Sequence, residues 1–348
     1  MNRVYLDYNA TAPLRPEAGA AMIAAMDVVG NPSSVHAEGR AARALVERAR
    51  AQVAAALGAE AADVVFTSGA TEAAALACAG RGLRGAVVEH DAVRAWIDAV
   101  LPVDTGGRVR VDDPARSVLQ LANSETGVMQ DLPPGLAVSD LTQIFGKRPV
   151  SFDDLGAEMA LVSAHKLGGP KGIGALVLRR GTDLAAQLRG GGQEMGRRAG
   201  TENVIGIAGF GAAAEAAAHD LAAGVWDEVE KFRNILENLI ADRANGTILV
   251  GKEVPRLPNT SCFVTPGWKG ETQVMAMDLA GFAISAGSAC SSGRVRASDV
   301  LAAMGFDFER AACAVRVSLG PETTEKDVTR LAETWLKCRD TQRARTGV

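Results

Sequence analysis

The first residue that suggests chemistry is a cysteine in a run of small residues. Cys290 lies in residues 285–295, whose sequence is SAGSACSSGRV. Unpaired cysteines usually pack as small apolar side chains inside a core, whereas glycine and serine on both sides predict a surface loop. The thiol of Cys290 is therefore expected to be accessible, and the rest of the sequence has to supply its reaction partner.

The second candidate is a lysine directly after an apolar run. Lys166 lies in residues 163–174, with the sequence SAHKLGGPKGIG. A partly desolvated amine at a strand end has a lowered pKa and suits a Schiff base. A lone loop lysine is more often an ordinary surface residue, but the chain has 8 lysines against 29 arginines, so a lysine is a rarer choice here. Both interpretations stay open on these residues alone.

Two other glycine-containing turns could meet an anion. Residues 67–72 (TSGATE) join a predicted strand to a helix, where backbone N–H groups and the Thr71 hydroxyl could bind a phosphate. The alternative is an ordinary capped turn. Residues 189–201 (RGGGQEMGRRAGT) carry Arg197, Arg198 and Thr201 among glycines, and they form either an anion-binding segment or a surface loop.

The elements that must position these residues alternate between strand and helix over the first part of the chain. Apolar runs predict strands, and a 3.6-residue period predicts helices. Strands are expected from residue 63 and at 86–88, 118–121, 160–163, 174–178, 247–250, 260–264 and 282–285. Helices are expected at 37–57, 71–79, 203–223, 225–243, 297–304 and 324–337. This order is typical of an α/β fold, with a large α/β domain over 15–225 and a smaller α+β domain that combines 226–348 with 1–14.

Composition excludes several classes of protein. A net charge of −4 and 4% aromatic residues argue against nucleic-acid binding. The sequence has no apolar run long enough to span a membrane and no signal peptide at its start, so a cytoplasmic location is expected. Five scattered cysteines without a CxxC pair favour reduced thiols over disulfides and predict no metal site.

Eleven motifs in chain order resemble the NifS/IscS-type cysteine desulfurases of the class V aminotransferase family, fold type I enzymes that use pyridoxal 5′-phosphate. The motifs are YLDYNATAP, GNPSSVHAEGR, FTSGATEA, VEHDAV, NSETGVMQD, DLTQ, SAHKLGGPKGIGAL, RGGGQEMGRRAGTEN, LPNTSC, SAGSACSSG and AVRVSLGPETTEKDV. The resemblance implies a mainly parallel, seven-stranded-type sheet flanked by helices in the large domain, which carries the lysine and the dimer interface. It places the cysteine loop in the smaller domain.

The resemblance also implies a role for each candidate residue. Lys166 would bind the cofactor covalently, Asp140 would accept a hydrogen bond from the pyridinium nitrogen, and His90 would stack on the ring and assist proton transfers. Outside this resemblance, His90 would be taken for a surface histidine. The remaining implied contacts are Asn123 and Gln143 at the ring hydroxyl; Ala70, Thr71, Ser163 and His165 at the phosphate, with Thr201 from the second subunit of a homodimer; and Arg316, Asn9 and Asn123 at the substrate.

The implied reaction gives Cys290 a purpose. Its thiolate would attack the sulfur of the substrate L-cysteine, giving L-alanine and a persulfide, and Arg294 and Arg296 add positive charge nearby. The persulfide would pass to an acceptor protein, in iron–sulfur cluster assembly or other sulfur trafficking. The other four cysteines lie in predicted helices or apolar runs and are expected to be structural.

The chain departs from the resemblance in ways that keep alternatives open. Three segments between the motifs are short, and Pro133 and Pro134 stand where relatives carry a crossover helix. Leu141 replaces a usual alanine beside Asp140, and the chain continues only briefly after residue 338. The alternatives are another class V enzyme, such as an aminotransferase or a selenocysteine lyase, and a trimmed relative without activity. Cys290 argues against an aminotransferase, which has no use for a thiol there.

Overall fold

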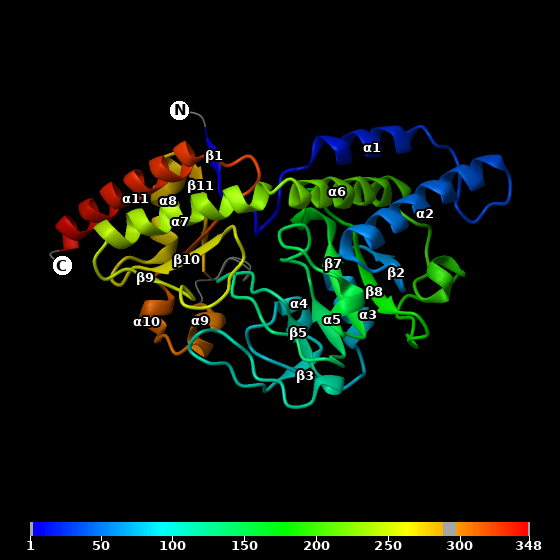
Figure 1. Cartoon of the computed structure of the whole chain (residues 1–348), viewed down its shortest axis with the longest axis horizontal. Coiled ribbons are helices and arrows are strands. Elements are labelled where there is room, and N and C mark those ends of the chain that lie inside the picture. Colours follow the sequence, from blue (N-terminus) through cyan, green and yellow to red (C-terminus); the bar gives the residue numbers. More distant parts are fainter. Residues whose placement is uncertain (1–2, 288–296, 347–348) are drawn as a thin grey trace.

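A five-stranded sheet forms the centre of the computed structural model, which describes residues 3–287 and 297–346 (Figure 1). The strand order is β2-β8-β7-β6-β5. The pairs β5–β6 and β6–β7 are parallel, whereas β8 is antiparallel to both β2 and β7. The strands are β2 (Ala62–Thr67), β5 (Val118–Gln120), β6 (Val138–Asp140), β7 (Met159–Ser163) and β8 (Gly174–Arg179).

The expected seven-stranded, mainly parallel sheet is therefore wrong for the described residues. Strands β3 (Leu83–Gly85) and β4 (Ile97–Ala99) form a separate two-stranded ladder, which an isolated bridge between Arg84 and Ser117 connects to the edge of the main sheet. The chain from β4 to β5 contains Pro102, Gly106 and Gly107, which interrupt a further strand because proline lacks a backbone donor and glycine weakens strands.

The strand expected at residues 86–88 is also wrong. This segment is a turn, closed by a hydrogen bond from the Glu89 N–H to the Ala86 carbonyl at 3.1 Å. Ala86 and Val88 are buried in a small apolar cluster with Cys262 and Val264. The run is apolar because its side chains are buried, and burial alone does not distinguish a strand from a turn.

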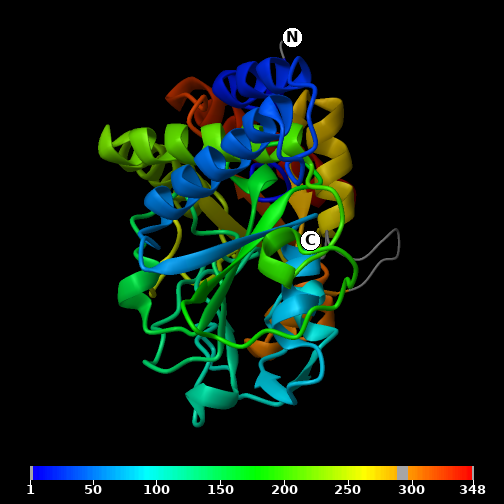
Figure 2. The same ribbon diagram turned by 90° about the vertical axis from the view of Figure 1, so that its right-hand side faces the viewer.

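Helices cover both faces of the five-stranded sheet, as Figures 1 and 2 show. Side chains alternate along a strand, so Val64 and Phe66 of β2 pack against α2 and α6 while Val65 packs against α3. Helix α1 lies on α6. The helices are α1 (Pro16–Met26), α2 (Ala37–Leu57), α3 (Ala70–Cys78), α4 (Asp91–Arg94), α5 (Phe152–Leu155) and α6 (Val204–Ala222), with 3₁₀ turns η1 (Pro114–Arg116), η2 (Ala164–Lys166) and η3 (Gln193–Gly196).

A second sheet has the order β12-β13-β10-β9 and is antiparallel. Its core contains Phe263, Trp268 and Trp335, whose rings are in contact. The elements of this C-terminal part of the chain are α7 (Val225–Arg243), β9 (Ile248–Leu249), β10 (Thr260–Val264), α8 (Gly270–Leu279), β11 (Phe282–Ala283), β12 (Ser285–Ala286), α9 (Asp299–Ala303), α10 (Phe308–Ala311), β13 (Ala314–Ser318) and α11 (Glu325–Thr346).

The start of the chain joins this C-terminal part. Strand β1 (Val4–Tyr5) pairs with β11, and the Tyr8 N–H donates to the Ser318 carbonyl. Residues 9–12 then cross to the five-stranded sheet, where the Ala12 N–H donates to the His165 carbonyl. The two-domain division at 14/15 and 225/226 stays a prediction.

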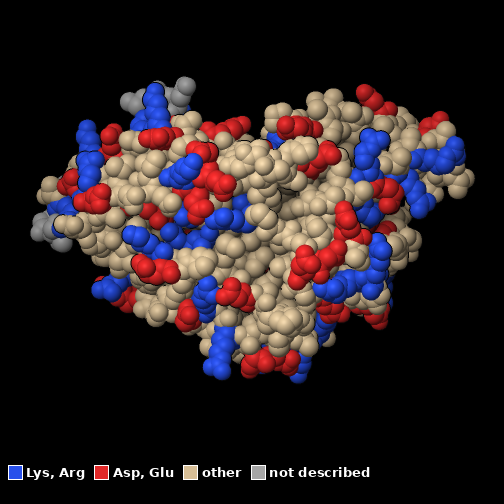
Figure 3. Space-filling model, in the orientation of Figure 1, with Lys and Arg blue, Asp and Glu red and all other residues tan. Residues whose placement is uncertain are grey.

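The connection from β5 to β6 confirms the missing crossover helix, since residues 121–137 contain no helix. Pro133 and Pro134 lie in this loop, and the proline ring disfavours a helix interior. Across the described residues, every helix is too short or too polar to cross a membrane. Figure 3 shows basic and acidic side chains intermixed on one face of the molecule.

Candidate active site

Most of the residues implied by the resemblance line one cavity of about 580 Å³. The cavity lies where strands β6 and β7 end and helix α3 begins, at the carboxyl edge of the parallel strands, where α/β sheets bind ligands. Its lining includes eight of the expected residues: Ala70, Thr71, His90, Asp140, Gln143, Ser163, His165 and Lys166. The fold thus brings together side chains that are far apart in the sequence.

Lys166 ends the short turn η2, directly after β7. Its Nζ donates to the main-chain oxygens of Asn9 at 2.7 Å and Ala10 at 2.8 Å. These carbonyls belong to the segment that crosses from the second sheet. They hold the amine in the wall of the cavity, so the N-terminal segment is part of the site.

His165 is adjacent to Lys166 and is neutral at physiological pH. Burial, followed by the charges of Lys166 and Lys171, lowers the pKa of His165 to about 4. The His165 Nδ1 lies 3.2 Å from Thr11 Oγ1. A neutral imidazole still has one N–H to donate, which suits an anion in the cavity.

The turn before α3 fits a phosphate group. Gly69 adopts φ 155° and ψ 177°, a conformation essentially restricted to glycine, and no side chain caps the helix. A phosphate at this position would accept from the N–H groups of the first helical turn, which Ala70 and Thr71 begin. The Ser68 N–H is already bound by Glu72 Oε2 at 2.7 Å, which fixes the turn.

Asp140 and Gln143 come from the end of β6 and the loop after it. One Asp140 oxygen accepts from the Thr142 N–H at 2.8 Å, so the carboxylate is held in one orientation. Gln143 Nε2 donates to the Asn9 carbonyl at 3.0 Å. A carboxylate, an amide, an amine and an anion-binding turn around one cavity match the groups of pyridoxal 5′-phosphate: the ring nitrogen, the phenol, the aldehyde and the phosphate.

His90 lines the same cavity from the N-cap of α4. Its Nδ1 accepts from the Ala92 N–H at 3.1 Å. In the neutral ring the proton is therefore on Nε2. His90 is exposed, and the helix cap fixes both the position and the tautomer of its imidazole.

The three expected substrate residues lie next to this cavity but are not in its lining. Arg316 is 2% exposed; it donates to Asp7 Oδ1 at 2.7 Å and to the Ser124 carbonyl at 3.0 Å. The Asn123 amide is bound at both ends, because it donates to the Val88 carbonyl and accepts from the N–H groups that follow it. Asn9 is 1% exposed and also forms side-chain hydrogen bonds.

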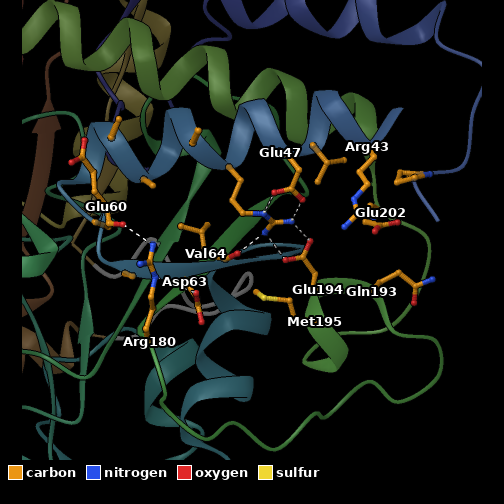
Figure 4. Close-up of a pocket in the computed structure, with 18 of the residues that line it drawn as sticks. Arg43, Glu47, Glu60, Asp63, Val64, Arg180, Gln193, Glu194, Met195 and Glu202 are labelled. Atoms are coloured by element: carbon orange, nitrogen blue, oxygen red, sulfur yellow. Dashed lines mark hydrogen bonds and ion pairs between the residues drawn. The ribbon is translucent and has the colours of Figure 1, made fainter. Parts of the chain in front are cut away.

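Thr201 is exposed and does not line the 580 Å³ cavity. Its neighbour Glu202 lines a different cavity, of about 1030 Å³, between α2 and residues 192–195 (Figure 4). There Glu194 forms an ion pair with Arg50 at 2.8 Å and accepts from the Phe66 N–H at 3.0 Å. The segment that carries Thr201 is thus attached to β2, the strand that precedes the turn at Gly69.

Cys290 lies outside the described residues. Of the other cysteines, Cys78, Cys262 and Cys313 are buried. Burial raises the pKa of Cys78 and of Cys262 to about 12. Since the thiolate is the nucleophile, these two thiols are inert at neutral pH, as expected for structural cysteines.

Some residues at the site received no role in the sequence analysis. Thr11, Thr142 and Lys171 line the cavity although each lies inside one of the quoted motifs, and Lys147 lies behind the cavity, bonded to Gln143. The sequence does carry a signal for Lys147: in a lysine-poor chain it stands four residues after Gln143. The two threonines lie inside the motifs YLDYNATAP and DLTQ, but no pattern distinguishes them from their neighbours there.

The sequence profile of the family described as Aminotransferase class-V matches residues 4–93 and 117–331. The unmatched residues 94–116 contain β4 and the loop where the sheet is interrupted. The chain is 39% identical to a cysteine desulfurase of Cereibacter sphaeroides, over 96% of this chain and 95% of that one. It is 36% identical to a cysteine desulfurase IscS of Dictyoglomus turgidum, over 93% of this chain and 91% of that one.

Solved structures agree with these relatives. A NifS-like protein from Rickettsia africae has a TM-score of 0.88 at 31% identity and covers 97% of this chain and 100% of its own. A protein described as SspA in complex with cysteine has a TM-score of 0.76 at 26% identity, over 92% of this chain. The chain belongs to the class-V aminotransferase family, among its NifS-like cysteine desulfurases.

Proposed function

We propose that the chain is a pyridoxal 5′-phosphate-dependent cysteine desulfurase, which converts L-cysteine to L-alanine and retains the sulfur as a persulfide on Cys290. The observation that carries this proposal is the convergence of Lys166, Asp140, His90 and the turn at Gly69 on one cavity. Relatives that are 35–39% identical over more than 90% of the chain bear the name cysteine desulfurase.

The cofactor, when bound, supplies an electron sink for bonds at the α-carbon of the amino acid. Lys166 provides the amine that holds it, and Asp140 provides a fixed carboxylate for its ring nitrogen. The first turn of α3 and the neutral His165 bind its phosphate without placing a further charge in the site. His90, with its proton on Nε2, lines the same cavity and would move a proton to or from the bound substrate.

Arg316 binds the substrate carboxylate. Its guanidinium is held by Asp7 and by the Ser124 carbonyl, which fixes its plane for two parallel hydrogen bonds to a carboxylate. The Cys290 thiolate attacks the substrate sulfur. A sulfur–sulfur bond forms, the carbon–sulfur bond breaks, and its electron pair stays with the carbon, which takes up a proton to give alanine. The persulfide then passes to an acceptor protein, such as an iron–sulfur scaffold.

The functional unit is a homodimer in which Thr201 reaches the phosphate site of the second subunit. Two observations support this arrangement: Thr201 is exposed and away from its own cavity, and α1 with the following turn exposes a group of large apolar side chains. These are Ile23 (67%), Met26 (60%), Val29 (81%) and Val35 (88%). An apolar group of this kind on the surface is typical of a protein interface.

The test combines cofactor absorbance with product analysis. Purified protein loaded with the cofactor is expected to absorb in the near-visible and to form alanine and, with a thiol reductant, sulfide from L-cysteine. Lys166→Ala loses the absorbance band and both products, whereas Cys290→Ser keeps the band and loses the sulfide. Lys337→Ala, an exposed lysine on α11, is the matched control and behaves as wild type. A wild-type protein that binds the cofactor but forms neither product contradicts the proposal.

A further inference from the structure

Lys147 is a fully buried lysine that the proposed chemistry does not use. It is 1% exposed. Burial and the nearby positive charge of Lys166 lower its pKa well below the ordinary lysine value. A buried amine is costly unless its N–H groups are hydrogen-bonded, so its partners show what keeps it there.

Both partners of Lys147 are amide oxygens of residues at the cavity. Its Nζ donates to Gln143 Oε1 at 2.9 Å and to Asn9 Oδ1 at 3.0 Å. The two acceptors satisfy both N–H groups of a neutral amine, which agrees with the lowered pKa. Because Lys147 Nζ donates both hydrogen bonds, the amide atoms that face it are the oxygens of Gln143 and Asn9.

The opposite ends of the two amides face other groups. Gln143 Nε2 donates to the Asn9 carbonyl at 3.0 Å, the same oxygen that accepts from Lys166 Nζ at 2.7 Å. Asn9 Nδ2 donates to Thr260 Oγ1 at 2.9 Å, while its Oδ1 also accepts from Asn259 at 3.1 Å. A rotation of either amide by 180° would turn its NH₂ group toward the N–H groups of Lys147 and its oxygen toward another acceptor. Lys147 therefore stabilises one orientation of each amide.

We propose that Lys147 is a positioning residue that holds the Gln143 amide with its oxygen away from the cavity and its NH₂ group toward the cofactor. This inference rests on the proposed function. The cofactor has a phenolic oxygen beside the group that Lys166 binds, and such an oxygen needs a donor. Without Lys147, the Gln143 amide would keep the hydrogen bond from Nε2 to the Asn9 carbonyl but lose the one at Oε1. It would then present its own oxygen to the cavity part of the time, which repels the phenolic oxygen and weakens binding.

The test measures cofactor dissociation and the absorbance maximum of the bound cofactor, not only turnover. Lys147→Met keeps the length of the side chain without its donors. We expect at least a tenfold rise in the dissociation constant and a displaced absorbance maximum. Lys326→Met, an exposed lysine of α11, is the matched control and leaves both unchanged. A Lys147→Met protein with wild-type affinity and spectrum overturns the inference.

A double-mutant cycle separates positioning from general damage to the fold. If Lys147 acts through Gln143, Lys147→Met in a Gln143→Met background weakens cofactor binding no further. Full additivity of the two losses overturns the inference.

Gln143→Glu provides a variant that does not depend on removing the buried lysine. It keeps an oxygen toward Lys147 and replaces the NH₂ group with a second oxygen, so it should bind the cofactor at least tenfold more weakly; unchanged binding overturns the inference. Failure of the wild-type protein to bind the cofactor at all is a different result, because it overturns the proposed function itself and this inference with it.

Discussion

Arg316, which we propose binds the substrate carboxylate, is held in place by two partners within the protein. Its guanidinium is 2% exposed and is held by Asp7 on one side and the Ser124 carbonyl on the other. The ion pair with Asp7, at 2.7 Å, is a structural role of Arg316 beside the proposed binding of the substrate carboxylate. The two roles are compatible, because an arginine carries five donors and these partners use two of them.

Arg316→Lys should raise KM for L-cysteine at least tenfold, with a smaller effect on kcat. Lysine keeps the charge but loses the planar pair of donors that matches a carboxylate. Steady-state kinetics with L-cysteine measure the change, and Arg310→Lys, on an exposed arginine, is the control. An unchanged KM would remove Arg316 from the substrate site.

Glu125 is expected to make stability depend on pH. Burial is the main cause that raises its pKa from 4.5 to about 7. Between these values the folded protein binds a proton that the unfolded chain lacks, so stability falls as pH rises from 4.5 through 7. The loss is about 1–2 kcal/mol for a partly exposed group. Glu125→Gln should therefore raise the melting temperature at pH 8 and leave it unchanged at pH 4; an equal shift at both pH values contradicts this.

The residues that could be predicted were those with a local pattern. Lys166 follows a strand and is surrounded by glycines, so its position in a cleft is encoded within a dozen residues. The partners of Lys147 are different in kind, because Asn9 lies 138 residues away in the sequence. Such a contact depends on β1 pairing with β11, which no local pattern contains.

At the scale of elements, we expect the turn between β2 and α3 to bind the phosphate of the cofactor. Gly69 adopts a conformation that a side chain disfavours, although a Cβ there would meet nothing within 4 Å. Gly69→Ala should therefore distort the turn without steric overlap and weaken cofactor binding about tenfold. Equilibrium dialysis measures the loss.

Gly181→Ala is the matched control for this turn. Gly181 also has a positive φ (85°) and open space around it, but it lies away from the cavity. Both substitutions carry a similar backbone cost of about 1–3 kcal/mol, so both should lower the melting temperature. A Gly181→Ala protein that loses the cofactor as readily as Gly69→Ala would show that the effect is general destabilisation.

Helices and central strands were easier to predict than the edge of the sheet. Helices α6 and α7 begin and end within one residue of the expected limits, since long periodic segments carry a strong signal. The sheet has five strands because the segment before β5 turns at residues 86–89 and is interrupted by Pro102. A resemblance in motifs predicts the sheet that is typical of the family. It does not predict which strands are absent from a chain whose segments between the motifs are shorter.

At the scale of the whole molecule, the site depends on parts of the chain that are far apart. Residues 9–12 enter from the second sheet, and Lys166 is anchored on them. The segment with Thr201 is fastened to β2 and α3 by Arg197–Asp63 and Arg198–Glu72 ion pairs. Glu72 also binds the Ser68 N–H. The segment that carries Thr201, which we propose to serve the second subunit, is therefore attached to the turn before α3 in its own subunit.

A mixed dimer tests whether Thr201 acts across the interface. Lys166→Ala homodimers lack the amine in both sites, and Thr201→Ala homodimers should release the cofactor at least tenfold faster than wild type. In a dimer with one subunit of each kind, the only site with Lys166 receives Thr201 from the other subunit. Differently tagged subunits, purified as the mixed dimer, should therefore retain the cofactor in that one site at the wild-type dissociation rate. If Thr201 serves its own subunit, the mixed dimer releases the cofactor as fast as the Thr201→Ala homodimer does.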